Sequence, residues 1–391
     1  MKKNVFKGLL TMCAFAAAFT SCSKENNDIP NVGKDTKSVF VKLDLNQKPQ
    51  TKAVEAPINN GTKAQVSELH VYFYKDSDKS IQKYLKINGA STPSLTDLTT
   101  TGAQIADVPV AADRVLVRGN VPSSVTLPTS GLITAVENLE VNITTQNDKD
   151  NILLGHLAAN ISQWDGTGSA PIAGMSAQDK YAEVTLIPAV ARIEIEGLQA
   201  QGAVINGFSL DGIYLTNFYE KLKMGDGSSV SPIVQYGADA TKYDENAATT
   251  LYTTANKTKL FDKFAPALVA SGSPLAVAPT PATNRWAYHV FQNEGTTAND
   301  QLQLVFKLSN VTADPSSGVV LENNQFLTVR GLKDNLGQIV KIEKGKIYTI
   351  SKADFKFDEG NLTTVPVTNA VGVWLKVTVK AWEVVPVKPN L

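Results

Sequence analysis

The sequence has little of what catalytic and metal-binding proteins usually need. Its 391 residues include two cysteines and three histidines, and no HxH, HExxH or CxxC spacing occurs. These absences exclude the common zinc motifs, and we expect neither a metal nor a cofactor. Lysine plus arginine equals aspartate plus glutamate, at 37 each, and no basic stripe is present. No nucleic-acid partner is therefore expected. No catalytic constellation stands out, which predicts that the protein is not an enzyme.

The few cysteines also limit disulfide chemistry. After a charged start, the apolar run Leu9–Phe19 is shorter than the ~20 residues that span a bilayer, which is typical of an export signal. Small residues then lead to Cys22, as in the lipobox of bacterial lipoproteins. We predict a signal peptide over 1–21 and lipidation at Cys22; the alternative is an ordinary signal with an incidental cysteine. Since Cys13 would be removed with the signal, no intramolecular disulfide is expected.

A strong strand pattern begins soon after this start. Residues 22–37 are polar and predict a flexible tether. The next residues alternate apolar and polar, which predicts a strand with one buried face; its inward residues are Val39, Val41, Leu43 and Leu45. The segment that follows is polar and contains proline. Such a segment is extended, exposed and open to a protease that cuts after lysine.

The rest of the chain is dominated by strand patterns. Leu69–Tyr74 and Ile81–Leu85 flank a turn and predict a hairpin. Helical patterns are few, and we expect short helices over 151–162 and 259–268. Further strands are expected in Val108–Val121, Trp286–Phe291, Leu302–Leu308, Phe326–Val329 and Ile339–Ile350. The pattern predicts an all-β protein of two β-sandwich domains.

A proline marks the expected domain boundary. In Tyr181–Glu196 the apolar residues occupy even positions before Pro188 and odd positions after it. A one-residue shift moves every side chain to the other face, so the strand would leave one sheet and enter another. We therefore predict domains over 38–188 and 189–391; a bulge within one sheet is the alternative.

Three features that suggest chemistry have simpler interpretations. His70, His156 and His289 lie far apart in strand or helix patterns, so structural roles are expected. Gly225–Ser229 resembles a phosphate-binding loop, but no helix pattern follows, which favours a surface loop. Asn147–Asn151 lacks the downstream residues of a calcium loop and predicts a turn.

The end of the chain contains the strongest alternation in the sequence. It predicts one long strand, and its apolar residues are Val371, Val373, Leu375, Val377 and Val379. A proline-containing tail follows, with Val384, Val385 and Val387. Such a tail is suited to a sheet edge or to another molecule.

At this point the sequence resembles the fimbrillins of Bacteroidetes, the subunits of type V pili. The resemblance is carried by the lipoprotein start and by Val190–Ile195, Phe208–Asn217, Gly345–Ile350 and Val377–Pro386. It implies two transthyretin-like domains and export as a lipoprotein to the outer membrane. It further implies that a trypsin-like protease removes the first strand (residues 38–52), and that the emptied groove accepts a donor strand from the C-terminal region of another subunit. The implied locations are the cell outer membrane and the surface fimbrium, with a role in adhesion.

The residues support this mechanism and leave the donor open. The donor is either the strand Val371–Val379 or the tail around Val384, Val385 and Val387. A neighbour's strand of matching alternation would refill the groove by β-augmentation. Because donor and acceptor differ, the contact propagates into a filament.

One departure from the family leaves alternatives open. The family's protease typically cuts after arginine, whereas the first arginine here is Arg114, within a predicted strand. The position that matches the family's cut is Lys52, directly before Ala53. Either the protease accepts Lys52, or the subunit keeps its strand and lipid and serves as an anchor. A tip adhesin would bind ligands through loops such as 217–253. A glycan-binding surface lipoprotein would need exposed aromatics, and the tryptophans are scattered at Trp164, Trp286, Trp374 and Trp382.

Overall fold

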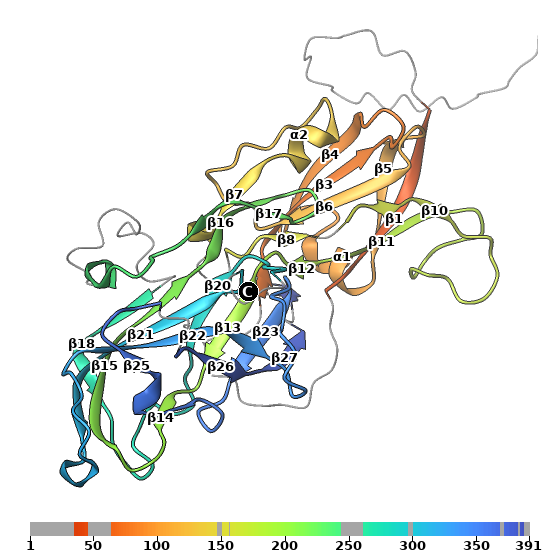
Figure 1. The fold of residues 1–391 in the computed structure, drawn as a ribbon. Helices are drawn as coiled ribbons and strands as arrows, with labels where there is room; N and C mark the ends of the chain where they lie inside the picture. Colours follow the sequence, from red (N-terminus) through yellow and green to blue (C-terminus); the bar gives the residue numbers. More distant parts are fainter. Residues whose placement is uncertain are drawn as a thin grey trace, which may run out of the picture. The chain divides into compact units, whose positions relative to one another are not determined.

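The computed structural model (Figure 1) describes residues 35–45, 64–146, 151–155, 157–243, 261–295, 300–367, 371–381 and 384–386. Contacts divide the chain into Met1–Asp35 and a compact unit, Thr36–Leu391, and the account below concerns the second. The signal peptide, Cys22 and the segment with Lys52 and Ala53 lie outside the described residues. The described part is mostly strands with few helices, so the all-β prediction is confirmed.

The first half of the unit builds two sheets. The β1 sheet has four strands, in the order β10 (Ser162–Gln163), β11 (Lys180–Thr185), β1 (Thr36–Asp44) and β5 (Ala103–Pro109). The β3 sheet has the order β12 (Ile187–Pro188), β8 (Leu154–Gly155), β6 (Arg114–Gly119), β3 (Glu68–Tyr74) and β4 (Ile81–Asn88), with β9 (Ala159–Asn160) also on β6. The predicted hairpin is confirmed, because β3 and β4 pair antiparallel from Glu68 to Tyr74.

The second half builds three sheets. The β13 sheet has the order β20 (Trp286–Val290), β13 (Ala191–Ile195), β23 (Lys346–Ile350) and β27 (Thr378–Ala381). A short sheet joins β19 (Ala276–Val277), β14 (Leu198–Ala200) and β24 (Lys356–Phe357). The β15 sheet has the order β18 (Phe261–Val269), β15 (Ile205–Thr216), β21 (Gln303–Ala313), β22 (Gln325–Lys333) and β25 (Leu362–Thr363), with β26 (Val373–Lys376) also on β22.

Two small sheets join distant parts of the chain. One pairs β17 (Ser229–Val234), β16 (Phe218–Lys223) and β7 (Glu140–Asn142), and the other pairs β2 (Ala64–Val66) with β28 (Val384–Pro386). The described helices are α1 (Leu95–Thr100), α2 (Ile133–Glu137) and the 3-10 turns η1 (Ile143–Thr145), η2 (Ala240–Tyr243), η3 (Pro315–Ser317) and η4 (Glu359–Asn361). None of these helices is long and apolar enough to cross a membrane.

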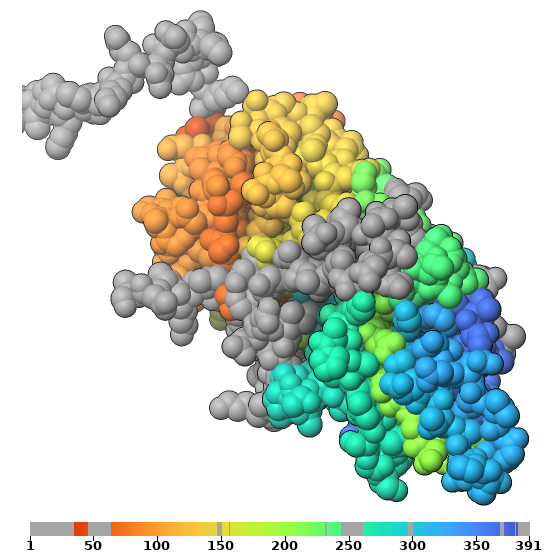
Figure 2. Space-filling model, turned by 90° about the vertical axis from the view of Figure 1, so that its left-hand side faces the viewer, coloured from red at the N-terminus to blue at the C-terminus, as the bar shows by residue number. Residues whose placement is uncertain are grey.

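The inward faces of these sheets share one buried core. Val39 and Val41 of β1 belong to the same buried cluster as Val71 of β3 and Val117 of β6. In the second half, Phe208 of β15 meets Phe357 of β24, with ring centroids 5.3 Å apart. Facing sheets with apolar inner residues are the arrangement of a β-sandwich. In Figure 2 the orange and yellow parts of the chain lie together, as do the green and blue parts.

Both helix predictions were wrong. Between 151 and 162 the described residues form β8, β9 and the start of β10, and Phe261–Val269 is the strand β18. Each pairs with a partner far along the chain: β8 and β9 with β6, and β18 with β15. Long-range pairing therefore overrides the local helical pattern. The helix α1 instead follows a capping box between Ser94 and Asp97, a local motif that fixes its start.

The segment proposed as loops over 217–253 is also more ordered than expected. Its described part contains β16, β17 and the turn η2. Of Gly225–Ser229, the first four residues lie in the turn between β16 and β17 and Ser229 begins β17, so a surface loop is the better description, although Gly227 is buried. Arg118 donates from Nη2 to the carbonyl of Gly225, at 2.6 Å. The calcium-like segment 147–150 and His156 lie outside the described residues.

The boundary predicted at Pro188 stays a prediction. Pro188 ends β12 in the β3 sheet, and β13 begins the next sheet at Ala191. Contacts nevertheless group Thr36–Leu391 as one unit. The two halves are tied by buried groups: Arg118 Nε donates to the carbonyl of Met224 at 2.8 Å, and His289 Nδ1 lies 2.6 Å from the carbonyl of Gln146.

Candidate functional site: the first strand, the tail and an outer pocket

Strand β1 forms with the face that the sequence predicts. Its inward residues Val39, Val41, Leu43 and the following Leu45 are at most 2% exposed. Phe40 and Lys42, which alternate with them, are only half-buried. The period of two therefore places these four apolar side chains in the core, while Phe40 lies on the opposite face.

The position of β1 within its sheet is central. It pairs in parallel with β11, where Val39 faces Lys180 and Leu43 faces Val184. On its other side it pairs antiparallel with β5, where Val39 faces Ile105. A strand bonded on both sides leaves two unpaired edges when it is removed. β1 thus contributes buried apolar side chains to the core and is an interior strand of this sheet.

The start of β1 is fixed by a lysine. Lys37 Nζ donates to the carbonyls of Val110, at 3.2 Å, and Ala112, at 2.5 Å. Burial lowers the pKa of Lys37, and the charge of Lys180 lowers it further. Gly102 brings β5 close to the strand: its φ is +78°, and a Cβ there would lie 3.2 Å from the carbonyl oxygen of Val41. This left-handed backbone and close approach favour glycine.

The C-terminal run is not the single strand that the sequence predicts. It divides into β26, which pairs with β22, and β27, which pairs with β23 in a different sheet. The break lies at Val377, whose amide donates to the carbonyl of Lys333 at 3.0 Å. Local alternation does not reveal such a change of partner.

The five residues of this run differ in burial. Leu375 and Val377 are buried, Val379 is 42% exposed, and Val371 and Val373 are half-buried. In this structure the run therefore contributes to the chain's own core.

The tail that follows pairs with the short strand β2. Val384–Pro386 (β28) lies parallel to β2, with Val384 opposite Ala64 and Pro386 opposite Val66. Val387 lies outside the described residues. The tail thus meets the chain just after the segment that contains Lys52.

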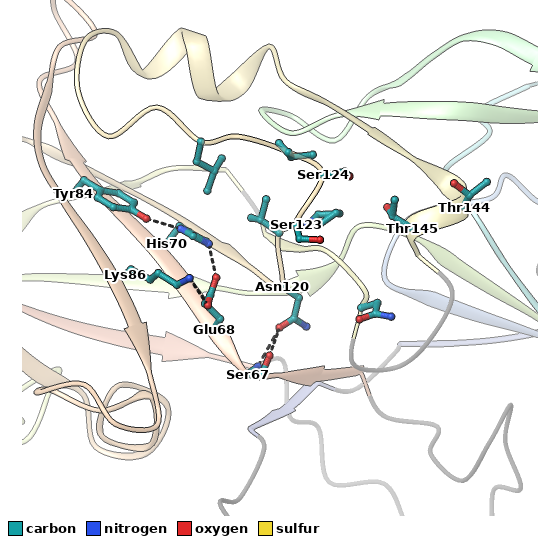
Figure 3. Close-up of a pocket in the computed structure, with 15 residues that line it drawn as sticks. Ser67, Glu68, His70, Tyr84, Lys86, Asn120, Ser123, Ser124, Thr144 and Thr145 are labelled. Atoms are coloured by element: carbon teal, nitrogen blue, oxygen red, sulfur yellow. Dashed lines mark hydrogen bonds and ion pairs between the residues drawn. The ribbon is translucent and has the colours of Figure 1, made fainter. Parts of the chain in front are cut away.

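A third feature, which the sequence did not predict, is a pocket of about 870 Å³ on the outer face of the β3–β4 hairpin. On that face lie Glu68 and His70 of β3 and Tyr84 and Lys86 of β4 (Figure 3). The residues between them, such as Leu69 and Val71, point into the core. The alternation of polar and apolar side chains in this strand was the available signal.

The polar residues of this wall form one chain of hydrogen bonds. His70 Nε2 lies 2.9 Å from Glu68 Oε1, and His70 Nδ1 lies 2.8 Å from the Tyr84 hydroxyl. Lys86 Nζ lies 2.7 Å from Glu68 Oε2. Since the carboxylate accepts from Nε2–H, Nδ1 accepts from the Tyr84 hydroxyl. Burial, together with the charge of Lys86, lowers the pKa of His70 although Glu68 raises it, which favours the neutral imidazole. A structural role for His70, as expected, is compatible with these contacts.

The described residues hold no group of three or more His, Cys, Asp or Glu side chains placed to bind a metal. Trp286 is buried and Trp374 is half-buried. Lys333 Nζ lies 4.8 Å from the centroid of the Trp374 ring. Over these residues the tryptophans form no shared platform, and Trp382 lies outside them.

Comparisons with known proteins give matches of structure only. No family model matches the sequence, and a search of curated proteins finds no match. A crystal structure of a fimbrilin (fimA) from Porphyromonas gingivalis W83 matches with a TM-score of 0.50 and 13% identity, over 90% of this chain and 98% of the other.

Two candidate cell adhesion proteins from Parabacteroides distasonis ATCC 8503 match equally well. Each has a TM-score of 0.50 and 13% identity; one match covers 91% of this chain and 99% of that chain, the other 89% and 99%. Identity this low carries the fold and nothing further. The predicted resemblance is confirmed at that level: this chain has the fold of fimbrilin and of these Bacteroidetes cell adhesion proteins.

Proposed function

We propose that this chain is a subunit of a cell-surface fimbria, exported as a lipoprotein through Cys22, cut after Lys52 and polymerised by donor-strand exchange. The observation that carries the proposal is the central, buried position of β1 in its sheet. The segment between β1 and β2 contains Lys52 within a polar, proline-containing stretch. Its partners would be the outer membrane before processing, a trypsin-like protease and other fimbrial subunits.

Removal of β1 would leave a specific vacancy. The three buried apolar side chains of β1 and that of the following Leu45 each contribute about 1.5–3 kcal/mol on burial. The edges of β5 and β11 would lose their ladder partner at the same time. A strand from a second subunit with apolar residues at every other position would restore both.

The tail is the better of the two donors. Leu375 and Val377 in the preceding run are buried in the chain's own core, so their withdrawal would open a second hole. The tail sequence places apolar residues at alternate positions, Val385, Val387, Pro389 and Leu391, matching the four inward residues of β1. Pro389 would cost one ladder hydrogen bond. The donor on one subunit and the groove on the next make a contact that propagates into a filament.

Limited trypsin treatment of a Cys22→Ser variant tests the proposal. Mass spectrometry should show a new N-terminus at Ala53, and negative-stain microscopy should then show filaments that resist mild denaturant. Lys52→Ala should prevent both, whereas Lys48→Ala, in the same segment, should leave both unchanged. Deletion of 382–391 should permit the cut and abolish the filaments.

Other results would redirect the proposal. Cleavage at Lys52 that yields only monomers would contradict strand exchange. A surface protein that begins at Cys22 in native fimbriae would contradict the cut and favour the anchor. Filaments from the protein without its tail would leave the run Val371–Val379 as the donor.

A further inference from the structure

The outer pocket lies where α2 no longer covers the outer face of the β3 sheet. On the outer face of this sheet, Tyr72 and Tyr74 pack with Ile133 and Val136 of α2 in a second buried cluster. His70 and Glu68 continue the same face of β3 beyond that cover, and the pocket lies over them. Its other side is the segment 121–127, which leads to the cover (Figure 3). The hollow is thus built between a rigid sheet and a loop. Its volume lies within the range of small-ligand sites.

The described residues of the pocket wall carry no net charge. Its charged lining residues are Glu68 and Lys86, which pair at 2.7 Å. His70 is 6% exposed and bonded at both ring nitrogens, and its burial favours the neutral ring. Among these described residues an ionic ligand would find no uncompensated charge to balance its own, and transfer of an unpaired charge from water is costly. The wall therefore suits a neutral ligand.

The rim supplies hydroxyl groups beside apolar surface. Ser123, Ser124 and Thr144 line the pocket, and their hydroxyls make no hydrogen bond to another described residue. A hydroxyl can both donate and accept, as can the hydroxyls of a sugar. Pro122 and Leu127 line the same space and offer apolar contact to the C–H faces of a pyranose ring.

An extended peptide fits this place less well. Strand β3 is hydrogen bonded on both sides, to β4 and to β6, and the lining side chains lie on the face of the sheet rather than along the free edge of β4. Peptides that bind sheets commonly use a free strand edge. The site instead provides side-chain hydroxyls and amides around a half-buried tyrosine, Tyr84.

We infer that this pocket binds a neutral, hydroxyl-rich oligosaccharide between the outer face of the β3–β4 hairpin and the loop 121–127. This binding site adds to the proposed function of a surface subunit. The inference rests on that function only for the place where the protein would meet the ligand. Every lining residue follows Lys52 in the sequence, so the site is retained whether or not the first strand is removed. Failure of filament assembly would leave the site intact, and loss of the site would leave assembly intact.

The test is binding of the full chain, purified in mild detergent, to an array of neutral, sialylated and sulfated oligosaccharides and of peptides. We expect retention by neutral oligosaccharides. Titration calorimetry with the strongest of these then compares variants. Ser124→Trp fills the mouth of the pocket and should weaken binding at least tenfold. Ser169→Trp, at an exposed serine outside the lining, should bind as the wild type does.

Tyr84→Phe tests the wall itself, because it keeps the ring and removes the hydroxyl that bonds His70. It should weaken binding severalfold while circular dichroism remains native. Retention of only acidic glycans, of only peptides or of nothing on the array would overturn the inference. So would equal affinity of natively folded Ser124→Trp and wild-type protein.

Discussion

The strands at the two ends of the described chain differ in how firmly the structure holds them. β1 has nine residues, two strand partners and three buried apolar positions, and the following Leu45 is buried as well. β28 has three residues and pairs with β2 over Ala64–Val66. Both are short extended segments next to polar, proline-containing sequence. The first is part of the core, whereas the pairing described for the second is with β2 alone.

This difference indicates the direction of any strand exchange. A segment with few partners opens at low free energy, while a core strand opens only with the fold around it. In the proposed exchange, the tail would therefore be the segment that leaves its own subunit unaided. β1 would need a covalent cut before the sheet could accept a replacement. The comparison predicts a ranking of mutational effects, from the core strand to the tail.

The largest effect is expected in β1. Leu43→Ala removes a side chain that is 1% exposed and should lower the free energy of unfolding by about 2–5 kcal/mol, because it leaves a cavity. Lys42→Ala, on the opposite face of the same strand, should change it by less than about 0.5 kcal/mol. Urea unfolding followed by tryptophan fluorescence measures both. Equal effects would show that β1 is not a core strand in solution.

A smaller effect is expected at Asn120, which connects β2, the strand that pairs with the tail, to the rest of the protein. Asn120 Nδ2 donates to the carbonyls of Gln65 and, at 3.1 Å, Ile152, and its Oδ1 accepts from the amide of Ser67 at 3.1 Å. Its φ is +52°, so Asn120→Gly removes these bonds without backbone strain. The free energy of unfolding should fall by about 1–3 kcal/mol, the cost of unsatisfied buried groups.

Asn310→Gly is the matched control for this change. Asn310 also has a positive φ, +50°, but it is exposed and makes one long side-chain contact, 3.4 Å to Ser209. It should change the free energy of unfolding by less than about 0.5 kcal/mol. If the two variants unfold at the same urea concentration, Asn120 does not clamp β2.

The sequence predicts β1 well because its information is local. Period-two alternation assigned Val39, Val41, Leu43 and Leu45 to the buried face, and that assignment is confirmed by their burial. The same rule failed for Val371–Val379. That stretch changes sheets at Val377, and such a change depends on partners from β22 and β23, far away in sequence.

The outer pocket was missed for a related reason. His70 was assigned a structural role, which its bonds to Glu68 and Tyr84 support. No sequence pattern indicates that the cover by α2 ends before Glu68. A pocket is a property of where packing stops, and that is set by tertiary contacts rather than by the periodicity of one strand.

A pH-dependent effect is expected at His70 of β3. Burial lowers its pKa from the ordinary value of 6.5, so the unfolded chain takes up the proton first. Stability should therefore fall as pH drops below about 6.5, down to the lower pKa of the folded protein. His70→Gln should flatten this part of the profile.

NMR titration of the ring checks the cause directly. The His70 signal, assigned by its loss in the variant, should titrate below pH 6.5. Groups around the ring act in opposite directions: Glu68 raises the pKa of His70, while Lys86 lowers it. A midpoint above 6.5 would show that the attraction of Glu68 exceeds the cost of burial.

The smallest effect on stability is expected in the tail. Deletion of 384–391 removes β28, whose described pairing is limited to the short strand β2. The free energy of unfolding should fall by less than about 1 kcal/mol, because a peripheral segment opens far below the global free energy of unfolding. Hydrogen exchange should agree: amides of Ala64–Val66 should exchange faster in the deletion variant, and those of β1 should not change. A loss as large as that of Leu43→Ala would place the tail within the core, and the tail could then serve as a donor only after this subunit had been opened as well.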